Sequence, residues 1–179
     1  MGDAGGGTGF GLRRARDGDG VGLAGVFGAA RAEMAYLPQL HSQEENVTFF
    51  SAGVLPTSWV TVAEVAGELV AFSAVKDRWL DHLYVVPGQQ GRGIGGALLG
   101  RAMTENPGGL TLWAFAANHR AIAFYERAGF VEVLRTDGSG NEERQPDVQM
   151  RWPGDGRRPG DGPRSSAAGR AGPGPGATS

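Results

Sequence analysis

The chain has 179 residues, 40 % of them apolar, a formal net charge of −2 and no cysteine. This length suits a single domain with its own core, and the missing cysteines exclude disulfides, thiolate metal sites and cysteine nucleophiles. The small net charge argues against a broad nucleic-acid surface, and neither a membrane span nor a signal peptide is recognisable, so we expect a cytoplasmic protein.

The two ends of the chain differ in composition from the segment between them. Residues 1–8 are rich in glycine, and 13 of the 27 residues from 153 to 179 are glycine or proline. The last segment has no large apolar residue, so it cannot bury enough surface to offset the entropy lost on ordering. We expect residues 1–8 and 153–179 to be disordered and residues 9–152 to form the folded domain.

The spacing of apolar residues alternates between the periods of strands and helices. In the first part of the chain it predicts a strand at 11–16, a helix at 17–36, a short helix from Ser42 to about Gly53, and a hairpin of strands at 58–66 and 69–76. Asp17 or Asp19 is available to cap the first helix.

The same reading continues to the end of the domain. It predicts a strand at 80–86, a helix at 92–105, a strand at 110–115, a helix at 118–128 closed by Gly129, and strands at 130–136 and 147–152. The order β-α-α-β-β-β-α-β-α-β-β predicts an α/β domain with a mixed sheet.

A glycine-rich loop joins the strand at 80–86 to the following helix. Unpaired amides and the positive end of the helix dipole make such a junction suitable for an anion, although a tight turn without a ligand has the same pattern. A P-loop is disfavoured because Gly96-Ala97 stands where Lys-Ser/Thr is needed. A dinucleotide fold is disfavoured because the loop lies mid-chain and the strand at 110–115 ends without an acidic residue.

Two motifs resemble those of the GNAT superfamily of N-acetyltransferases. The segment from Gln90 to Gly95, QGRGIG, resembles the family's pyrophosphate-binding motif Gln/Arg-x-x-Gly-x-Gly/Ala. The segment from Asn118 to Phe130, NHRAIAFYERAGF, resembles its second signature. The resemblance extends over about residues 11–152 and implies a mixed, mostly antiparallel sheet, flanked by about four helices and splayed centrally to admit acetyl-CoA.

The resemblance also implies which residues hold acetyl-CoA. Backbone groups of the strand would pair with the pantetheine arm, and loop amides would hold the pyrophosphate. The implied cofactor-binding residues are Leu83, Tyr84, Val85, Gln90, Gly91, Arg92, Gly93, Ile94, Gly95, Gly96 and Asn118. Asn118 is equally suited to cap its helix, and the two roles are compatible.

The implied reaction is direct attack of an amine on the thioester. Tyr125 would protonate the departing thiolate, although its spacing also fits a core residue. An amine of pKa ~10 needs a base at neutral pH, at a cost of about 4 kcal/mol. Asp81 and His82 are candidates, and in a regular strand only one of the pair faces the cofactor slot. The other candidates are Glu33 or His41 near the acceptor side, and the acidic loop between the last two strands.

The segment TDGSGNEERQPDVQMRW resembles the C-terminal hairpin of a bacterial GNAT subgroup. Glu142, Glu143 and Asp147 would gather three carboxylates there, and with His41 they would bind a cationic acceptor. The alternative is a polar hairpin in which Gly138 and Asn141 make the turn.

Together these observations predict an enzyme that moves an acetyl group from acetyl-CoA to a primary amine of a small cationic molecule or a peptide. The alternative is a non-catalytic module that binds CoA or acyl-CoA. The scattered histidines predict no metal, and neither nucleic acid nor membrane is expected as a partner. A homodimer is left open.

Overall fold

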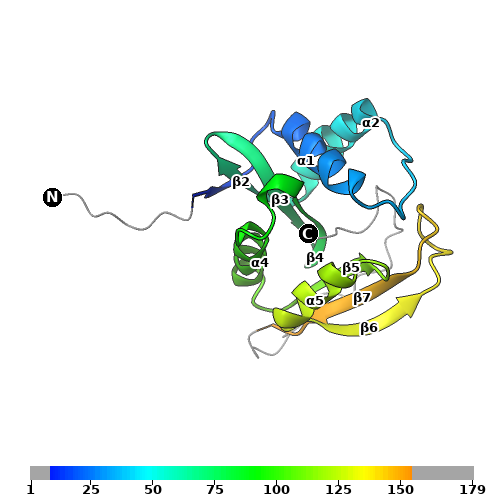
Figure 1. The fold of residues 1–179 in the computed structure, drawn as a ribbon. Coiled ribbons are helices and arrows are strands. Elements are labelled where there is room, and N and C mark those ends of the chain that lie inside the picture. Colours follow the sequence, from blue (N-terminus) through cyan, green and yellow to red (C-terminus); the bar gives the residue numbers. More distant parts are fainter. Residues whose placement is uncertain (1–8, 155–179) are drawn as a thin grey trace.

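A seven-stranded sheet with the order β1-β2-β3-β4-β5-β7-β6 organises the domain (Figure 1). The computed structural model describes residues 9–154, so the expectations for residues 1–8 and 155–179 lie outside the described residues. The strands are β1 (Gly11–Arg14), β2 (Trp59–Val65), β3 (Glu68–Lys76), β4 (Trp79–Val85), β5 (Leu110–Phe115), β6 (Val131–Thr136) and β7 (Asp147–Trp152). The helices are α1 (Gly20–Ala32), α2 (Gln43–Thr48), a π-helix (Phe49–Val54), α3 (Leu55–Thr57), a 3-10 turn (Pro87–Gln89), α4 (Ile94–Glu105) and α5 (His119–Arg127).

The strand pairing confirms a mixed, mostly antiparallel sheet. All neighbouring strands are antiparallel except β4 and β5, which are parallel. That parallel pair is joined at a single position, Trp79 opposite Thr111. The Thr111 amide also donates to the Arg78 carbonyl at 2.9 Å. Beyond this point the two strands separate, so the sheet is splayed at its centre as expected.

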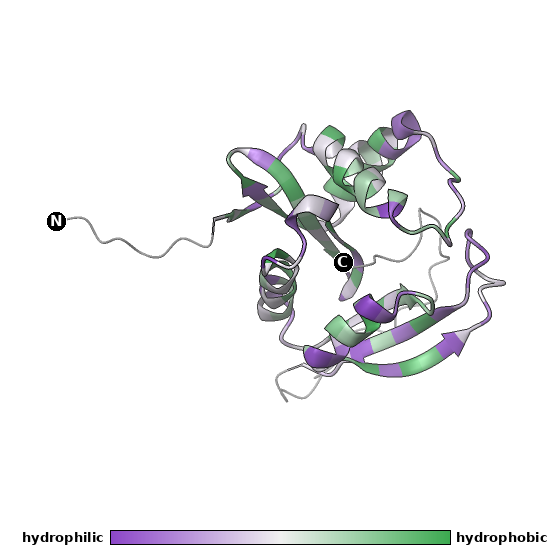
Figure 2. Cartoon of the chain, viewed as in Figure 1, coloured by the Kyte–Doolittle hydropathy of each residue, from purple (hydrophilic) through white to green (hydrophobic). Residues whose placement is uncertain are grey.

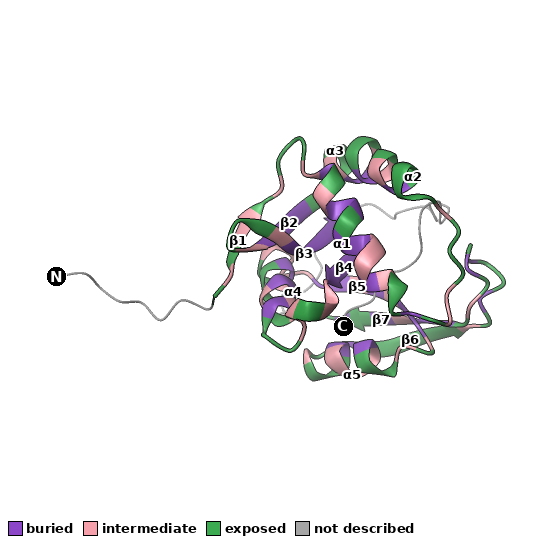
Figure 3. Cartoon of the chain, turned by 45° about the horizontal axis from the view of Figure 1, so that its top comes forward, coloured by how far each residue is buried: buried purple, intermediate pink, exposed green. Residues whose placement is uncertain are grey.

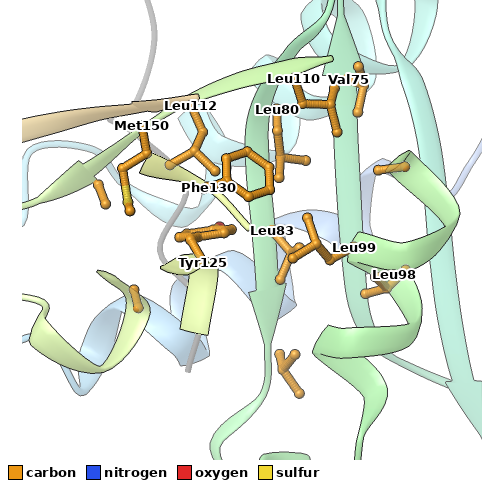
Figure 4. Packing of buried hydrophobic residues seen from close by; sticks show 14 of the residues in the cluster. Val75, Leu80, Leu83, Leu98, Leu99, Leu110, Leu112, Tyr125, Phe130 and Met150 are labelled. Atoms are coloured by element: carbon orange, nitrogen blue, oxygen red, sulfur yellow. The ribbon is translucent and has the colours of Figure 1, made fainter. Parts of the chain in front are cut away.

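Side chains bury the two faces of the sheet in separate clusters. The cluster under α4 and α5 continues across the junction of β4 and β5 and includes Leu83, Leu98 and Tyr125 (Figure 4). The cluster under α1 and the π-helix includes Phe27 and Phe50. Figure 2 shows apolar residues concentrated in β2 to β4, and Figure 3 shows the same strands buried while β6 is exposed. Each face of the sheet is therefore covered by its own helices.

The first helix is shorter than its periodicity predicts. It begins at Gly20, where an added Cβ would lie 2.0 Å from the Ser51 hydroxyl oxygen, so glycine permits α1 to pack on the π-helix. Asp19 precedes it, but its carboxylate accepts hydrogen bonds from Arg13 and from the Arg16 amide instead of capping α1. This interaction ties the start of α1 to β1.

The second helix differs from the single helix expected between Ser42 and Gly53. Ser42 and Glu45 form a capping box at the start of α2, but a π-helix follows. The Leu55 amide donates to the Phe50 carbonyl, five residues back, so this turn holds one extra residue. Pro56 explains the change, because its ring would clash with the preceding turn of a regular α-helix.

The other elements match the predicted ranges to within two residues. The helix expected at 92–105 begins at Ile94, because Gly93 adopts a left-handed conformation with φ 83° and precedes the first helical turn. Among residues 9–154 there is no helix with the length and hydropathy needed to cross a bilayer. The same residues contain no group of three or more His, Asp or Glu side chains placed to hold a metal ion.

Candidate active site

A β-bulge at Asp81 directs β4 away from β5. In the pairing of β3 with β4, Val75 lies opposite Leu80 and Ala74 lies opposite His82, so Asp81 is the extra residue. A bulge bends its strand and increases its twist. It also interrupts the side-chain alternation, since Leu80 and Leu83 belong to one core cluster while Tyr84 belongs to the other. The regular alternation expected for this strand is therefore broken at Asp81.

The strand after the bulge borders the opening between β4 and β5. Leu83, Tyr84 and Val85 are buried and pair with Ser73, Phe72 and Ala71 of β3 on one side. On the other side, the ladder with β5 is limited to the position of Trp79. The three residues expected to meet the pantetheine arm thus lie along the opening, which we call the notch.

The loop before α4 presents its glycines to open space. Gly91 and Gly93 have φ values of 73° and 83°, which glycine adopts without strain. A Cβ added at Gly91, Gly93 or Gly96 would meet no atom within 4 Å. The first turn of α4 contains no acidic residue and receives no side-chain cap. Its exposed amides and dipole therefore remain suited to an anion.

Polar side chains connect this loop to both neighbouring elements. Gln90 donates from Nε2 to the Val85 carbonyl at 3.4 Å and accepts from Arg120 Nη1 at 3.3 Å. Arg92 bonds to Gln89 within the loop. Arg120 was not among the expected site residues, although it lies two positions after Asn118 in the second motif. Two arginines, Arg92 and Arg120, consequently flank the loop.

Tyr125 and Asn118 are both placed by α5. The Asn118 Oδ1 accepts from the Ala121 amide at 3.0 Å, which is the capping role foreseen as one alternative. Tyr125 is 1 % exposed, its ring centroid lies 5.5 Å from that of Phe130, and it points from α5 towards β4 (Figure 4). Its core position is compatible with a hydroxyl near the notch.

Burial shifts the pKa values of the two candidate bases on β4 in opposite directions, because it favours the neutral form of each group. Burial lowers the pKa of His82 to about 3, and the charge of Arg31 adds to this effect. Burial raises the pKa of Asp81 to about 6, against an opposing effect of Lys76. At neutral pH His82 is therefore neutral and a weak base, whereas Asp81 is ionised and more basic than an ordinary aspartate. The aromatic rings around His82 are those of Phe27, Phe49, Phe50, Phe72 and Tyr84.

The loop between β6 and β7 is closed by its own hydrogen bonds. The buried Asp147 accepts from Thr136 Oγ1 at 2.6 Å and from Asn141 Nδ2 at 2.9 Å. Asn141 also donates to the Gln145 carbonyl at 2.7 Å. At Gly138 an added Cβ would lie 2.3 Å from the Gln145 backbone. These contacts correspond to the polar-hairpin alternative for this segment.

The three carboxylates expected to form one acidic surface do not lie together. Asp147 is inside the loop, and Glu143 has a fully buried side chain paired with Arg31 at 3.1 Å. Only Glu142 is exposed, and its carboxylate lies 2.9 Å from His41 Nε2. The loop thus packs against the end of α1 and the segment before α2. No local sequence pattern indicates a role for Arg31, since its partner Glu143 lies 112 residues later in the chain.

An open hollow lies beside α2, next to the aromatic rings around His82. Its volume is about 620 Å³, and its lining is Ser42, Glu44, Glu45, Thr48 and Phe49. The ring centroid of Phe49 is 6.0 Å from that of His82. A smaller hollow of about 120 Å³, lined in part by Arg13, Arg14 and Trp59, lies over β1 and β2 and away from the notch. Neither hollow is lined by a residue of β4 or β5, so both lie outside the notch.

Comparison with known proteins agrees with this geometry. Residues 56–132 match the acetyltransferase (GNAT) domain family. The chain is 34 % identical over 79 residues to the peptidyl-lysine N-acetyltransferase YjaB of Salmonella typhimurium, and that match covers 44 % of this chain and 53 % of the relative. The chain thus spans about half the length of this curated relative.

Solved structures match over more of the chain. The apo form of YjaB from Escherichia coli superposes with a TM-score of 0.65 at 23 % identity, covering 81 % of this chain and 98 % of that one. The putative acetyltransferase yncA from Salmonella typhimurium, solved with its cofactor acetyl-CoA, gives 0.63 at 18 % identity, covering 81 % and 94 %. These likenesses establish the fold.

Proposed function

We propose that the chain is an N-acetyltransferase of the GNAT superfamily that uses acetyl-CoA, since residues 56–132 match the acetyltransferase (GNAT) domain family. Its acceptor is a primary amine of a small cationic molecule or a peptide. The observation that carries the proposal is the opening of β4 from β5 directly before a glycine loop whose outer side is empty. A ligand with a linear arm and a pyrophosphate matches that combination in shape and charge.

The cofactor would lie along β4 and end at α4. The amides from Gly91 to Gly96 would hold the pyrophosphate, with Arg92 and Arg120 adding positive charge. The backbone of Leu83 to Val85 would meet the pantetheine arm. The positive φ angles of Gly91 and Gly93 support this assignment, because they turn the loop without placing a side chain in front of it.

The chemistry needs one base and one acid. Asp81, with its pKa raised to about 6, is the better base for deprotonating the acceptor ammonium, since His82 is too weakly basic. The free amine then attacks the thioester carbonyl. The Tyr125 hydroxyl donates a proton to the departing thiolate. The carbon–nitrogen bond forms, the nitrogen releases its second proton to solvent, and the carbon–sulfur bond breaks. Tyr125 then regains its proton from solvent, and no covalent enzyme intermediate is required.

The acceptor side is acidic at its rim. Glu142 is exposed on the β6–β7 loop, and Glu44 and Glu45 line the hollow beside α2. Exposed carboxylates attract a substrate that carries positive charge in addition to the reacting amine. A basic peptide or a polyamine meets this requirement.

Acetyl-CoA binding and turnover test the proposal together. At 100 times its dissociation constant, a ligand of the folded state adds roughly 2.7 kcal/mol to the free energy of unfolding, so acetyl-CoA should raise the melting temperature. Thiol release is then measured with polyamines, aminoglycosides, amino acids and peptides as acceptors. Stabilisation without thiol release from any acceptor would support a non-catalytic acyl-CoA-binding module, and no stabilisation would reject both functions.

Tyr125→Phe isolates the acid step. The variant keeps the ring packed in the core and removes only the hydroxyl. We expect kcat to fall by roughly 10- to 1000-fold while the Kd of acetyl-CoA changes little. Undiminished kcat would assign Tyr125 to the core alone.

A further inference from the structure

Among residues 9–154, the buried polar atoms without a hydrogen-bond partner include Arg31 Nη1, the Tyr36 hydroxyl and His82 Nδ1. A buried donor or acceptor left unpaired costs about 1–3 kcal/mol, so such atoms are rare and require an explanation. His82 is 4 % exposed, which makes its unpaired nitrogen especially unfavourable unless a ligand reaches it.

These atoms come from α1, from the segment that follows α1, and from β4. Phe27 lies between two of them, with its ring centroid 5.2 Å from the Arg31 guanidinium and 6.4 Å from the His82 ring. Tyr36 packs edge-on against Phe115 at the end of β5, at a centroid distance of 6.0 Å. Asn118 lies close enough to the Tyr36 hydroxyl to lower its pKa, but the pair does not reach hydrogen-bond geometry, and the Asn118 Oδ1 accepts from the Ala121 amide. The set therefore lies where β4 and β5 are apart.

The charge on this set is largely balanced. Arg31 Nη2 donates to the buried Glu143 at 3.1 Å, so Nη1 belongs to a paired guanidinium and not to an isolated cation. Burial raises the pKa of Tyr36, which keeps the hydroxyl protonated. His82 is neutral at physiological pH, so one ring nitrogen donates and the other accepts. With His82 in the tautomer that carries its hydrogen on Nε2, the set offers two donors for an oxygen and one acceptor for an amine hydrogen.

We propose that Arg31, Tyr36 and His82 select an acceptor amine that has a carbonyl oxygen on the adjacent carbon, as in the free N-terminus of a peptide. Arg31 and Tyr36 donate to that oxygen, and His82 accepts a hydrogen from the amine. This inference rests on the proposed acetyltransferase function and narrows its acceptor. The lysine side-chain amine and polyamines have no oxygen at this spacing, so they leave Arg31 Nη1 and the Tyr36 hydroxyl unpaired.

The ion pair between Arg31 and Glu143 also distinguishes a free amino acid from a peptide, although both have a carbonyl carbon next to the one that bears the amine. A free amino acid presents a carboxylate, whereas a peptide presents a neutral carbonyl. Glu143 already neutralises Arg31, so a second carboxylate would be buried with an unfavourable net negative charge. The peptide N-terminus is therefore the better match, and its own positive amine is drawn by the acidic rim.

The test compares matched acceptors on the full chain. One short basic peptide has a free N-terminus and arginine in place of lysine. A second has the same length but a blocked N-terminus and one lysine, and a third is the first peptide with its first carbonyl replaced by a methylene. A free amino acid and a polyamine complete the set. We expect kcat/KM for the first peptide to exceed that for each of the others by at least about 10-fold.

Tyr36→Phe shows whether the preference arises from this set. The variant should raise the KM of the first peptide about 10-fold and leave the methylene analogue unchanged, because that analogue has no oxygen to lose. A purely structural effect of Tyr36 would alter both equally and would overturn the inference. Equal or greater activity on the blocked lysine peptide would also overturn it.

Binding separates this inference from the proposed function. The affinity of each peptide is measured by calorimetry with CoA present, without turnover. Tighter binding of the first peptide than of its methylene analogue would support the inference even if no thiol is released. Equal affinities would reject it even if the protein acetylates another amine.

Discussion

The loops on the two sides of the notch use glycine in opposite ways. Before α4, the backbone at Gly91 and Gly93 adopts positive φ angles and faces open space. Between β6 and β7, Gly138 also has a positive φ, 81°, but it lies directly against the Gln145 backbone. The first loop leaves its amides accessible, whereas the second encloses its polar groups around Asp147.

The difference shows that a polar, glycine-rich segment can serve binding or folding. In the first loop, glycine allows another molecule to approach the backbone. In the second, it allows the loop to approach itself, and the acidic residues are used in internal contacts. The two roles are distinguished by whether the space beside the glycine Cα is empty or filled by the protein's own backbone. The amino-acid composition of the loops does not distinguish them.

The largest expected effect is a loss of folding stability, and it comes from the loop between β6 and β7, which we call the closed loop. Gly138→Ala would place a Cβ within 2.3 Å of the Gln145 backbone at a φ of 81°. We expect the free energy of unfolding in urea to fall by about 2–4 kcal/mol. Gly140→Ala is the control in the same loop, since its Cβ would meet nothing within 4 Å. Equal losses in the two variants would remove the proposed distinction.

The glycine loop before α4, which we call the open loop, should show the reverse pattern. A substitution there should weaken acetyl-CoA binding and leave most of the folding stability intact. Gly93→Val would fill space that is empty in the structure. We expect the Kd of acetyl-CoA to rise at least 100-fold, which corresponds to about 2.7 kcal/mol, measured by calorimetry. Unfolding should lose only about 1–2 kcal/mol from the left-handed conformation. Gly100→Val, on an open face of α4, is the control, and unchanged binding by the Gly93 variant would contradict the pyrophosphate assignment.

Asp81 tests whether the strand before the open loop supplies the base. Its pKa is raised to about 6 by burial, so kcat/KM should fall about 10-fold for each pH unit below 6 as the carboxylate is protonated. Asp81→Asn should abolish this acid limb and lower the rate at neutral pH. A limb that persists in the variant would assign the titration to another group.

The same shift predicts a pH dependence of stability. The folded pKa of Asp81 lies above the unfolded value of 3.8. The folded state therefore binds the proton more tightly, and the stabilising contribution is present below pH 3.8 and lost as pH rises through about 6. Relative to Asp81→Asn, the parent should become less stable between pH 4 and pH 6.5. Urea unfolding at several pH values measures this difference.

The smallest expected effect is at the exposed tip of the closed loop. Glu142→Gln removes a carboxylate that is 44 % exposed, so stability should change by less than about 1 kcal/mol. The KM of a cationic acceptor should rise about 2- to 3-fold at low salt and less at high salt, because exposed charges are screened. Glu68→Gln, at the distant start of β3, is the control. A KM unaffected by both the substitution and salt would exclude the loop from acceptor attraction.

Local patterns were sufficient to predict the element order and the loop before α4. Alternating apolar residues in β2 and β3, and the left-handed glycines before α4, depend on neighbours in the chain. The π-helix was not predictable from helical spacing, because a single extra residue per turn leaves no distinct pattern over so short a segment. The bulge at Asp81 depends on the register with β3, which no local pattern specifies.

The acceptor side was predicted less well because its contacts are long-range. Glu143 is buried against Arg31, which lies 112 residues earlier in the chain. Its sequence neighbours are all polar, so nothing nearby indicates burial. Asp147 likewise resembles a surface residue until Thr136 and Asn141 close around it. Counting the three carboxylates of this loop therefore overestimated the negative charge available to an acceptor, because only that of Glu142 is exposed.

The parallel ladder between β4 and β5 consists of one residue pair, Trp79 and Thr111, and this affects how the two parts of the sheet can separate. Beyond that pair, β5 has a ladder only with β7, and the side chains of one core cluster bridge the two halves of the sheet. Apolar packing resists separation but imposes no register. The unit of β5, β6, β7 and α5 can therefore exchange its amide protons through a sub-global opening that leaves β2 and β3 intact. Any molecule that occupies the notch would join the two units into one cooperative structure.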